Sequence, residues 1–509
     1  MKKILFHLAG AIVLLAAILF EINAQPILDN TFSGDGYLLN KVSIAEDDVA
    51  RTVLIQSNGR ILTGGNSFGQ IGNTDIHIIR TKSNGSMDNT FGVGGIATIP
   101  GGFFCDMALL SGGKIIVAGS GVGPTNTNNY IVYRFTKNGV LDTTFGNAGS
   151  VEVNMLYENM ICNDVTIQPD GKILLGGYTS GVHRNMIIVR LKANGNLDNN
   201  FATGGIFKLE IANRGSACYQ LAMQNDGKIV AGGFIDMIIL NSYYIFDFGA
   251  VRLTASGILD NTFGDGGVVI ANKQYVDAAS SVSILSDGRI VLGGSTNNFG
   301  DNKFAALCLL TNGSLDSTFG TGGWSVPDFY GGNAVCNAMI VEPDDDIIMA
   351  GNASINAGNS YYPTVAMAKL LSNGIQDNAF GDYGLDTSFF GVASLGCNDI
   401  ALQSDNKIII AGARNVGAHS SYFIARYTNS PALQKESQLT FPSGIEASVY
   451  PNPNSGDFIV SFSNPLQEPI TITIINLLGQ VVYEDNPASS AYQTNLAITL
   501  SPDLADGIY

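Results

Sequence analysis

Basic residues are scarce in this sequence, and charge of either sign is low. Charged residues make up 14% of the 509 positions, and 43 Asp and Glu outweigh 26 Lys and Arg to give a net charge of −17. Nucleic-acid binding requires a basic surface for the phosphates, and docking on anionic lipid requires one as well. The composition therefore argues against both kinds of partner. An apolar share of 45% excludes a disordered chain, and 61 Gly favour a turn-rich all-β protein.

Motifs for catalysis and metal binding are also missing. The chain has four His, and none has a zinc-like spacing to other ligands. It contains no Gly-x-Ser-x-Gly elbow, no His-Glu-x-x-His and no phosphate loop. The Phe-Gly-Asp-Gly-Gly string at Phe263 lacks the regular run of acidic ligands that calcium needs. We therefore expect no enzyme, no metal and no cofactor.

The N-terminus has the pattern of a signal peptide over residues 1–24. Lys2 and Lys3 precede an apolar run over residues 4–20, and Ala24 provides a small residue for cleavage before Gln25. The alternative is an uncleaved anchor, because the run approaches membrane-spanning length. No Cys lies near the cleavage site, which argues against a lipid-anchored lipoprotein. No later segment is apolar enough to span a membrane. After cleavage we expect no membrane span.

Two motifs recur seven times each and are the strongest signal in the sequence. The second motif resembles Asp-Gly-Lys-Ile-x-x-Gly-Gly and begins at Ser57, Ser111, Pro169, Asn225, Ser286, Asp344 and Ser404. The first resembles Leu-Asp-Asn-Thr-Phe-Gly and centres on Asp29, Asp88, Asp142, Asp198, Asp260, Asp316 and Asp377.

Each repeat predicts four short strands, A to D. Strand A precedes the Asp-Gly turn and strand B follows it, strand C ends in Asn-Gly, and strand D follows a Phe-Gly-x-Gly-Gly segment. Four strands in a repeat of about 58 residues are the dimensions of a propeller blade. The fold class that we predict is all-β, a seven-bladed β-propeller of four-stranded blades with a small C-terminal β-sandwich. The competing architecture is an open solenoid of small sheets.

The repeats are out of phase with the ends of the chain by one strand. The first motif, from Leu28, predicts a strand D before any A, B or C strand, and the last repeat ends with a C strand over residues 422–427. We predict that the N-terminal strand completes the last blade and closes the ring, which removes two exposed sheet edges. Tyr37 and its neighbours should then lie beside residues 423–426.

A charge pair recurs in the repeats. A basic residue of strand C lies eight residues before the motif Asp, and Cys308 interrupts the series before Asp316. A pair that is present in nearly every blade is typical of a scaffold, and we predict structural ion pairs. They are Arg80–Asp88, Arg134–Asp142, Arg190–Asp198, Arg252–Asp260, Lys369–Asp377 and, across the ring closure, Asp29–Arg426.

Five of the six Cys follow the repeat register in strand A, which argues against disulfides in an exported chain. Four of these lie ten residues before the turn residue that precedes strand B, and two other blades have Ala50 and Ala279 there. Cys105 fits the series with a one-residue deletion, nine residues before Lys114. A position that alternates Cys with Ala predicts buried packing, and symmetry-related positions of neighbouring blades rarely approach disulfide distance. We expect free, buried thiols at Cys105, Cys162, Cys218, Cys336 and Cys397.

The B–C connections are the irregular ones, and recognition is usually placed on varied loops of a rigid frame. Several of them carry Tyr residues that are suited to stacking on sugars or peptides. The alternative is that these Tyr cap the hairpins. The candidate ligand-binding residues are Tyr130, Tyr243, Tyr244, Tyr361 and Tyr362.

The character of the chain changes after Thr428. Residues 429–446 have the Pro, Ser and charge of a linker, and residues 447–509 alternate as short strands. The landmarks YPNP at Tyr450, LLGQ at Leu477 and GIY at Gly507 resemble the C-terminal sorting domain of the type IX (Por) secretion system of Bacteroidetes. In that family the chain continues past GIY, so we expect that this sorting domain is incomplete.

The two repeated motifs, over about residues 26–430, resemble the delta-60 repeat family. The resemblance implies a β-propeller of largely undefined biochemical role, and the chain departs from it at residues 344–346, where Asp346 replaces the basic turn residue of the other repeats. Together the two resemblances imply export by the type IX machinery to the surface or exterior of a Gram-negative bacterium. We expect a non-catalytic binding or scaffold module with a glycan or protein ligand. The alternative is a surface enzyme that degrades polysaccharide or peptide, with carboxylates or a His converging in a pocket.

Overall fold

The computed structural model describes two parts of the chain. The first is residues 28–429, apart from 44–45, 70–73, 123–127, 156–157, 182, 240–242, 274–275, 299–300, 330, 358–359, 389 and 391–394. The second is the backbone of seven short strands outside that range. The expected cleavage site, within residues 9–27, lies outside the described residues. Within both parts the structure consists of strands and turns, and it has no helix with the length and apolar character of a membrane span.

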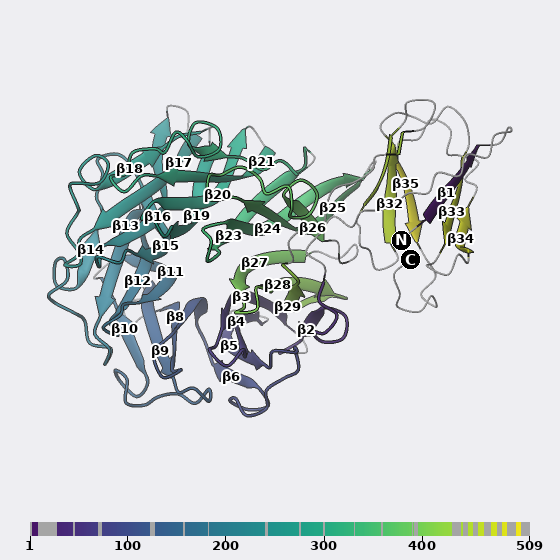
Figure 1. Ribbon diagram of the computed structural model, residues 1–509. Coiled ribbons are helices and arrows are strands. Elements are labelled where there is room, and N and C mark those ends of the chain that lie inside the picture. Colours follow the sequence, from purple (N-terminus) through teal and green to yellow (C-terminus); the bar gives the residue numbers. More distant parts are fainter. Residues whose placement is uncertain are drawn as a thin grey trace.

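Residues 28–429 form seven sets of four antiparallel strands, which we call blades 1 to 7 (Figure 1). Blades 4 and 5 are joined into one sheet by a single parallel bridge between their strands. Blades 1 to 4 contain β3 (Asp47–Ile55), β4 (Ile61–Phe68), β5 (Thr74–Thr81) and β6 (Ile96–Ile99); β7 (Phe103–Leu109), β8 (Ile115–Val122), β9 (Asn128–Phe135) and β10 (Ser150–Val153); β11 (Asn159–Ile167), β12 (Ile173–Ser180), β13 (Asn185–Leu191) and β14 (Ile206–Lys208); β15 (Ser216–Met223), β16 (Ile229–Ile239), β17 (Tyr243–Leu253) and β18 (Val268–Ala271). Blades 5 to 7 contain β19 (Val276–Ile284), β20 (Ile290–Asn298), β21 (Asp301–Leu309) and β22 (Trp324–Ser325); β23 (Asn333–Val341), β24 (Ile347–Ala357), β25 (Ser360–Leu370) and β26 (Leu385–Ser388); β27 (Leu395–Leu402), β28 (Ile408–Val416), β29 (His419–Tyr427) and β2 (Tyr37–Asn40).

The last blade takes its outer strand from the start of the chain. β2 pairs antiparallel with β29, with Tyr37 opposite Ala425 and Asn40 opposite Tyr422. This is the pairing that the phase of the repeats predicts. The first strands of the blades contact one another in a cycle in which β27 meets β3 (Figure 1). Blades 7 and 1 therefore pack together, and Ile409 and Ile424 share a core cluster with Val53 and Ile61.

The A–B turn explains the recurrent Asp-Gly. In blade 3, Gly171 adopts φ +80° and donates its N–H to the Gln168 carbonyl at 2.8 Å. The Asp170 carboxylate accepts the Lys172 N–H at 3.1 Å. The positive φ favours glycine, and Asp345 and Asn406 take that conformation in blades 6 and 7, at φ 69° and 62°. The turn geometry is thus kept where the motif departs from Gly.

The Gly-Gly of the second motif allows strand A to approach strand B closely. Every A–B pair has a register shift, which in blade 3 lies between Cys162 and Asp164. A Cβ on Gly177 would lie 2.0 Å from the Ile161 carbonyl oxygen and 2.3 Å from the Tyr130 hydroxyl. No side chain fits there, so the motif needs glycine at this position.

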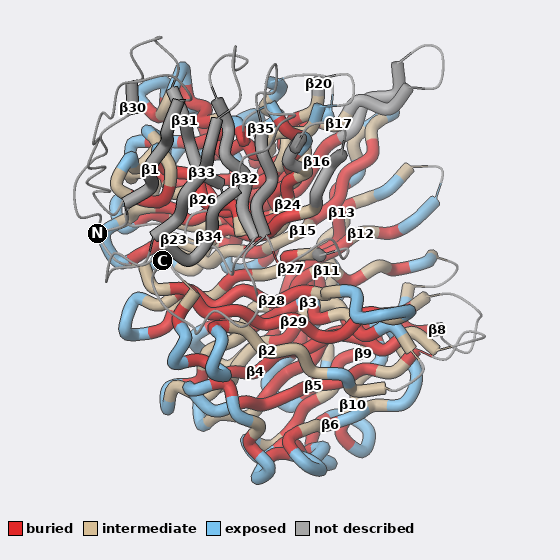
Figure 2. Tube along the Cα trace, turned by 90° about the vertical axis from the view of Figure 1, so that its right-hand side faces the viewer, coloured by how far each residue is buried: buried red, intermediate tan, exposed pale blue. Residues whose placement is uncertain are grey.

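The core lies between adjacent blades, where their sheets pack face to face. One cluster combines Ile116 and Val132 of blade 2 with Val165, Leu175 and Val189 of blade 3. Buried residues follow the strands and exposed residues follow the connecting turns (Figure 2). The connecting turns are therefore the parts of the propeller that are most exposed to solvent.

The strands outside residues 28–429 form two small sheets. Strands β30 (Leu439–Thr440), β31 (Glu446–Tyr450), β32 (Asp457–Phe462) and β35 (Asn495–Thr499) pair in that order. The second sheet contains β1 (Lys3–Leu8), β33 (Ile470–Ile475) and β34 (Val481–Asp485). The start of the N-terminal segment is therefore a strand that pairs antiparallel with β33.

Candidate functional site

The Tyr residues of the B–C connections differ in where they lie. Tyr130 is fully buried between blades 2 and 3, and its hydroxyl donates to the Ile161 carbonyl at 3.2 Å. Its expected role in ligand binding is therefore wrong, because its alternation in β9 points it into the core. Tyr243 pairs with Ile239, and Tyr362 pairs with Ile355, near the ends of two long hairpins. The side chains of Tyr243, Tyr244, Tyr361 and Tyr362 lie outside the described residues.

All six Cys are free, and five of them are buried. The exception is Cys105, which is half-buried. Phe104 pairs with Gly119 and takes the register that Cys162 has in blade 3, so Cys105 is the bulge residue that follows. The alignment of Cys105 with a one-residue deletion was wrong, because Phe104 already lies ten residues before Lys114.

The repeated Arg–Asp pair joins each blade to the next. Arg80 Nε lies 2.8 Å from Asp88 Oδ2, Nη1 donates to the Lys137 carbonyl of blade 2, and Nη2 donates to Thr90. The guanidinium also stacks on Phe91, at 4.7 Å from the ring centroid. A buried guanidinium that is bonded to both its own blade and the next stabilises the frame. The same ion pair is present at Arg134–Asp142, Arg190–Asp198, Arg252–Asp260 and Arg426–Asp29.

Blade 6 has the charges of this network rearranged. Lys369 Nζ lies 3.6 Å from Asp377 Oδ2, 2.7 Å from Glu342 Oε2 and 3.6 Å from Asp346 Oδ2. In the described part of the chain, Glu342, Asp344 and Asp346 are the one group of carboxylates close enough together to share a metal ion. The Lys369 ammonium already supplies the positive charge at this cluster, so it forms part of the frame.

Blade 5 lacks the strand-C base and keeps only the basic residue of its A–B turn, a position that also contacts the motif Asp in blades 1, 2, 4 and 7. Cys308 stands where the other blades have a base, and Arg289 of the A–B turn reaches across to Asp316, with Nη1 3.1 Å from Oδ2. Asp316 is buried and also accepts the Thr318 hydroxyl at 2.6 Å. The hydrogen bonds from Thr318 and the Arg289 charge lower the pKa of Asp316. The sequence analysis missed this contact, although a basic turn residue recurs at this position in the repeats.

A second polar layer links the first strands. The side chain that follows the bulge accepts a hydrogen bond from a backbone N–H of the next blade. Two of these acceptors are buried carboxyl groups, and burial raises the pKa of Asp106 to about 6 and that of Asp399 to about 7. These acceptors were not predicted, because their partners lie in other repeats. The bonds run from Val53 to Asp399 (2.7 Å), from Val165 to Asp106 (3.0 Å), from Leu221 to Asp164 (3.2 Å) and from Val282 to Gln220 (2.7 Å).

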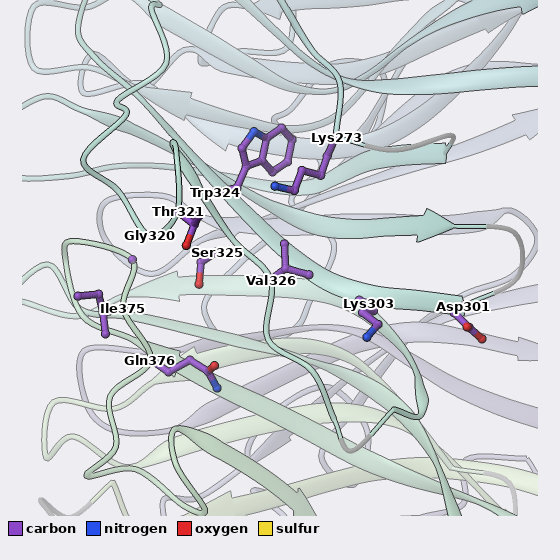
Figure 3. Close-up of a pocket in the computed structure, with 11 residues that line it drawn as sticks. Lys273, Asp301, Lys303, Gly320, Thr321, Trp324, Ser325, Val326, Ile375 and Gln376 are labelled. Atoms are coloured by element: carbon purple, nitrogen blue, oxygen red, sulfur yellow. The ribbon is translucent and has the colours of Figure 1, made fainter.

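A groove of about 890 Å³ lies at the rim of blades 5 and 6 (Figure 3). Blade 5 contributes Lys303 of β21 and the short strand β22, and blade 6 contributes the C–D turn over residues 374–376. Lys273, which follows β18 of blade 4, lines the groove next to Trp324. Four separate parts of the chain thus meet here. Its lining residues are Lys273, Asp301, Lys303, Gly320, Thr321, Trp324, Ser325, Val326, Gly374, Ile375 and Gln376.

The groove lies where the outer strand of blade 5 is cut short. β22 pairs only over Trp324 and Ser325, whereas β18 of blade 4 pairs over four residues. Pro327 falls where the next hydrogen-bonded pair with Phe304 would form, and proline has no N–H to donate. The first half of β21 therefore lacks the outer strand that covers the matching residues in blade 4.

The groove is lined by charged side chains and by the apolar ring of Trp324. Lys273 Nζ lies 5.7 Å from the centroid of the Trp324 ring, which is buried against Phe248 with 5.2 Å between ring centroids. Lys303 Nζ lies 2.6 Å from Asp328 Oδ2, and both groups are partly exposed. Of the lining residues, Asp301 alone is acidic. The groove thus brings together two lysines, one of them paired with Asp328, amide and hydroxyl groups, and an indole. Trp324, the single Trp of the sequence, was the signal that could have drawn attention to this place.

Comparison with known families identifies both parts of the chain. Residues 56–91, 111–145, 168–201, 285–319 and 403–430 match the "Domain of unknown function (DUF5122) beta-propeller" family. These five segments carry the repeat of that β-propeller family. Residues 448–509 match the secretion system C-terminal sorting domain. The propeller is therefore followed by a tail that indicates export by the type IX machinery to the cell surface or the exterior.

Solved structures resemble the propeller weakly. A protein of unknown function from Dyadobacter fermentans DSM 18053 has a TM-score of 0.39 at 10% identity, over 77% of this chain and 98% of that one. Drosophila Plexin A in complex with Semaphorin 1b has 0.37 at 10% identity, over 77% and 86%. The Penicillium chrysogenum α-L-arabinanase complexed with arabinobiose has 0.36 at 10% identity, over 65% and 98%. No curated protein matches the chain. Similarities at this level carry no information on function.

Proposed function

We propose that this exported propeller is a binding module for an anionic polysaccharide, which it holds in the groove of blades 5 and 6. The observation that carries the proposal is the pair Lys273 and Lys303 in one groove of a chain whose net charge is −17. The proposed boundaries are a signal peptide over 1–24, the propeller over 25–428, a linker over 429–446 and the sorting domain over 447–509.

The lining chemistry supports a carboxylated or sulfated sugar polymer. The ammonium groups of Lys273 and Lys303 pair with the anions, and the Gln376 amide and Ser325 hydroxyl bond to sugar hydroxyls. The negative charge elsewhere on the propeller repels the same polymer and favours the groove over other surfaces.

Two long hairpins extend this proposal to the predicted Tyr residues. β16 and β17 of blade 4 and β24 and β25 of blade 6 have 11 residues each, and β20 and β21 of the intervening blade 5 have nine. The B–C end of blade 5, next to Asp301, therefore lies between two longer hairpins. We propose that a polymer leaving the groove at this end meets one of them.

Binding to polymers of defined charge tests the proposal. The exported chain should bind immobilised polygalacturonate or dextran sulfate in interferometry, bind neutral dextran much more weakly, and lose affinity as salt is raised. The double variant Lys273→Ala and Lys303→Ala should weaken binding by at least about tenfold, which corresponds to ~1.4 kcal/mol. Lys192→Ala, at an exposed turn of blade 3, is the matched control and should leave affinity unchanged. Equal binding by both variants, or no preference for the charged polymers, would refute the proposed site.

The alternative of a degrading enzyme has its own outcome. Hydrolysis of a glycosidic bond usually requires two carboxylates, and the lining residues supply one, Asp301. If the protein releases reducing ends from the same polymers, and Asp301→Asn abolishes that release, the enzymatic proposal would replace the binding proposal. Reducing ends that stay at background while the polymer remains bound would support a binding module.

A further inference from the structure

Two free thiols meet at the junction of blades 2 and 3. Cys105 is the bulge residue of β7, and Cys162 lies in β11, the first strand of the next blade. Ser120 of β8 contacts both residues: its Oγ lies 3.6 Å from Cys105 Sγ and accepts the Cys162 N–H at 3.1 Å. One hydroxyl therefore spans the two cysteines.

The other junctions show where a bulge side chain points. At four of the six other junctions the bulge residue donates a hydrogen bond to the backbone carbonyl of the residue in the Cys162 register of the next blade. Cys105 is the bulge residue of blade 2, and the residue in that register of blade 3 is Cys162. The equivalent bonds are Asn163 to the Cys218 carbonyl (2.7 Å), Ser280 to the Cys336 carbonyl (3.0 Å), Asn337 to the Cys397 carbonyl (2.6 Å) and Asn398 to the Ala50 carbonyl (2.7 Å).

The argument from symmetry against disulfides does not apply to this pair. It concerns cysteines in the same register of neighbouring blades, such as Cys162 and Cys218. Cys105 stands one residue later, at the bulge, and so faces the next blade directly. Burial raises the pKa of the Cys162 thiol well above its usual value, and the Cys105 thiol beside it adds to the shift. Cys105 is also the half-exposed member of the pair.

We propose that Cys105 and Cys162 form a disulfide that ties blade 2 to blade 3 when the exported chain meets a disulfide oxidant. Exported proteins pass through compartments where such oxidants are present. The Cys105 thiolate attacks one sulfur of the oxidant, a mixed disulfide forms, and one oxidant thiol leaves with a proton. The Cys162 sulfur then attacks Cys105 Sγ and expels the second oxidant thiol. One S–S bond breaks and one forms, the two cysteines lose two hydrogens, and the oxidant gains them.

The cross-link would act on the ring through β7 and β11. It closes a loop that contains the rest of blade 2, and a loop of that length lowers the entropy of the unfolded chain. The oxidised protein should therefore melt at a higher temperature than the reduced one. Of the other four cysteines, three face an Asn or Ser bulge residue of the preceding blade and one lies in strand C, so all four should remain thiols.

Oxidation of the exported chain with oxidised glutathione tests the proposal. Digestion without reduction should yield one cross-linked peptide pair containing Cys105 and Cys162, and thiol labelling of the denatured protein should fall from six groups to four. The melting temperature should rise on oxidation, and Cys105→Ser should abolish both the cross-link and the rise. Ser280→Cys recreates the arrangement at Cys336 and should add a second cross-link. Six labelled thiols after oxidation, a mixed disulfide that stays at Cys105, or a cross-link to another residue would overturn the proposal.

Discussion

The absence of a strand-C base leaves Asp316 of blade 5 with Arg289 as its cation, which makes this blade more sensitive than blade 1 to loss of the turn base. Arg289→Ala removes the cation that lies 3.1 Å from the buried Asp316. Arg60→Ala removes the cation at the same turn position of blade 1, where Asp88 keeps Arg80 at 2.8 Å. Both substitutions remove an arginine from the A–B turn. They differ in the carboxylate that remains, because Asp88 keeps a second cation and Asp316 does not.

The expected magnitudes follow from burial. Asp316 is 5% exposed, and its remaining side-chain contact is Thr318. Removing one partner of a buried pair costs about 3 kcal/mol, because the other charge stays in a medium that solvates it poorly. Arg60 is 38% exposed and its partner keeps a second cation, so its loss should cost no more than about 1 kcal/mol. At about 2 °C for each kcal/mol, the melting temperature should fall by about 6 °C in Arg289→Ala and by about 2 °C or less in Arg60→Ala.

Differential scanning calorimetry of the three proteins measures these shifts. Adding Cys308→Arg to Arg289→Ala should restore most of the loss, because Thr318 and Phe319 stand where the other blades bind their arginine. The pKa of Asp316 is lowered in the folded chain, so the deficit of Arg289→Ala should shrink as pH falls below about 4. Equal shifts for the Arg289 and Arg60 variants, or no recovery with Cys308→Arg, would refute the reasoning.

Three further predictions concern closure, titration and domain structure. Deleting residues 25–40 removes β2 and should lower the melting temperature sharply; an unchanged value would show that the ring does not depend on this strand. Burial raises the pKa of Asp386 to about 7 in the folded chain, so its contribution to stability is lost as pH rises from about 4 to 7. Asp386→Asn should accordingly be more stable than the parent at pH 8 and equal to it at pH 4 in thermal denaturation, and the opposite order would contradict this. Limited proteolysis should cut first within residues 429–446, and early cuts inside the blades would count against two domains.

The framework was accessible from the sequence because its contacts repeat. The pairing of Tyr37 with Ala425 follows from counting strands and placing the leftover D motif. The distances in the Arg80–Asp88 pair and its relatives follow from a constant spacing of eight residues across one hairpin. In both cases the partners are set by a local pattern, and seven copies of that pattern reveal it without knowledge of the tertiary structure.

The candidate site was not accessible in this way. Tyr130 was expected at the surface and is buried, because strand alternation, and not loop membership, decides which way its ring points. The register of Cys105 was misjudged because a β-bulge inserts a residue without changing the motif around it. The groove was missed because Lys273, Trp324 and Gln376 come from three different repeats.

The sequence by itself determined the all-β class, the sevenfold repeat, the strand that begins the chain as the partner of its last repeat, and the sorting tail. Each of these rests on patterns within one repeat or on the order of repeats, which hydrogen bonding between consecutive strands preserves. The tertiary structure alone decided which side chains of different blades come together: Cys105 with Cys162, and the two lysines of the groove. Those contacts depend on the packing of one blade against the next and on where a strand ends at a proline, and no spacing along the chain encodes them.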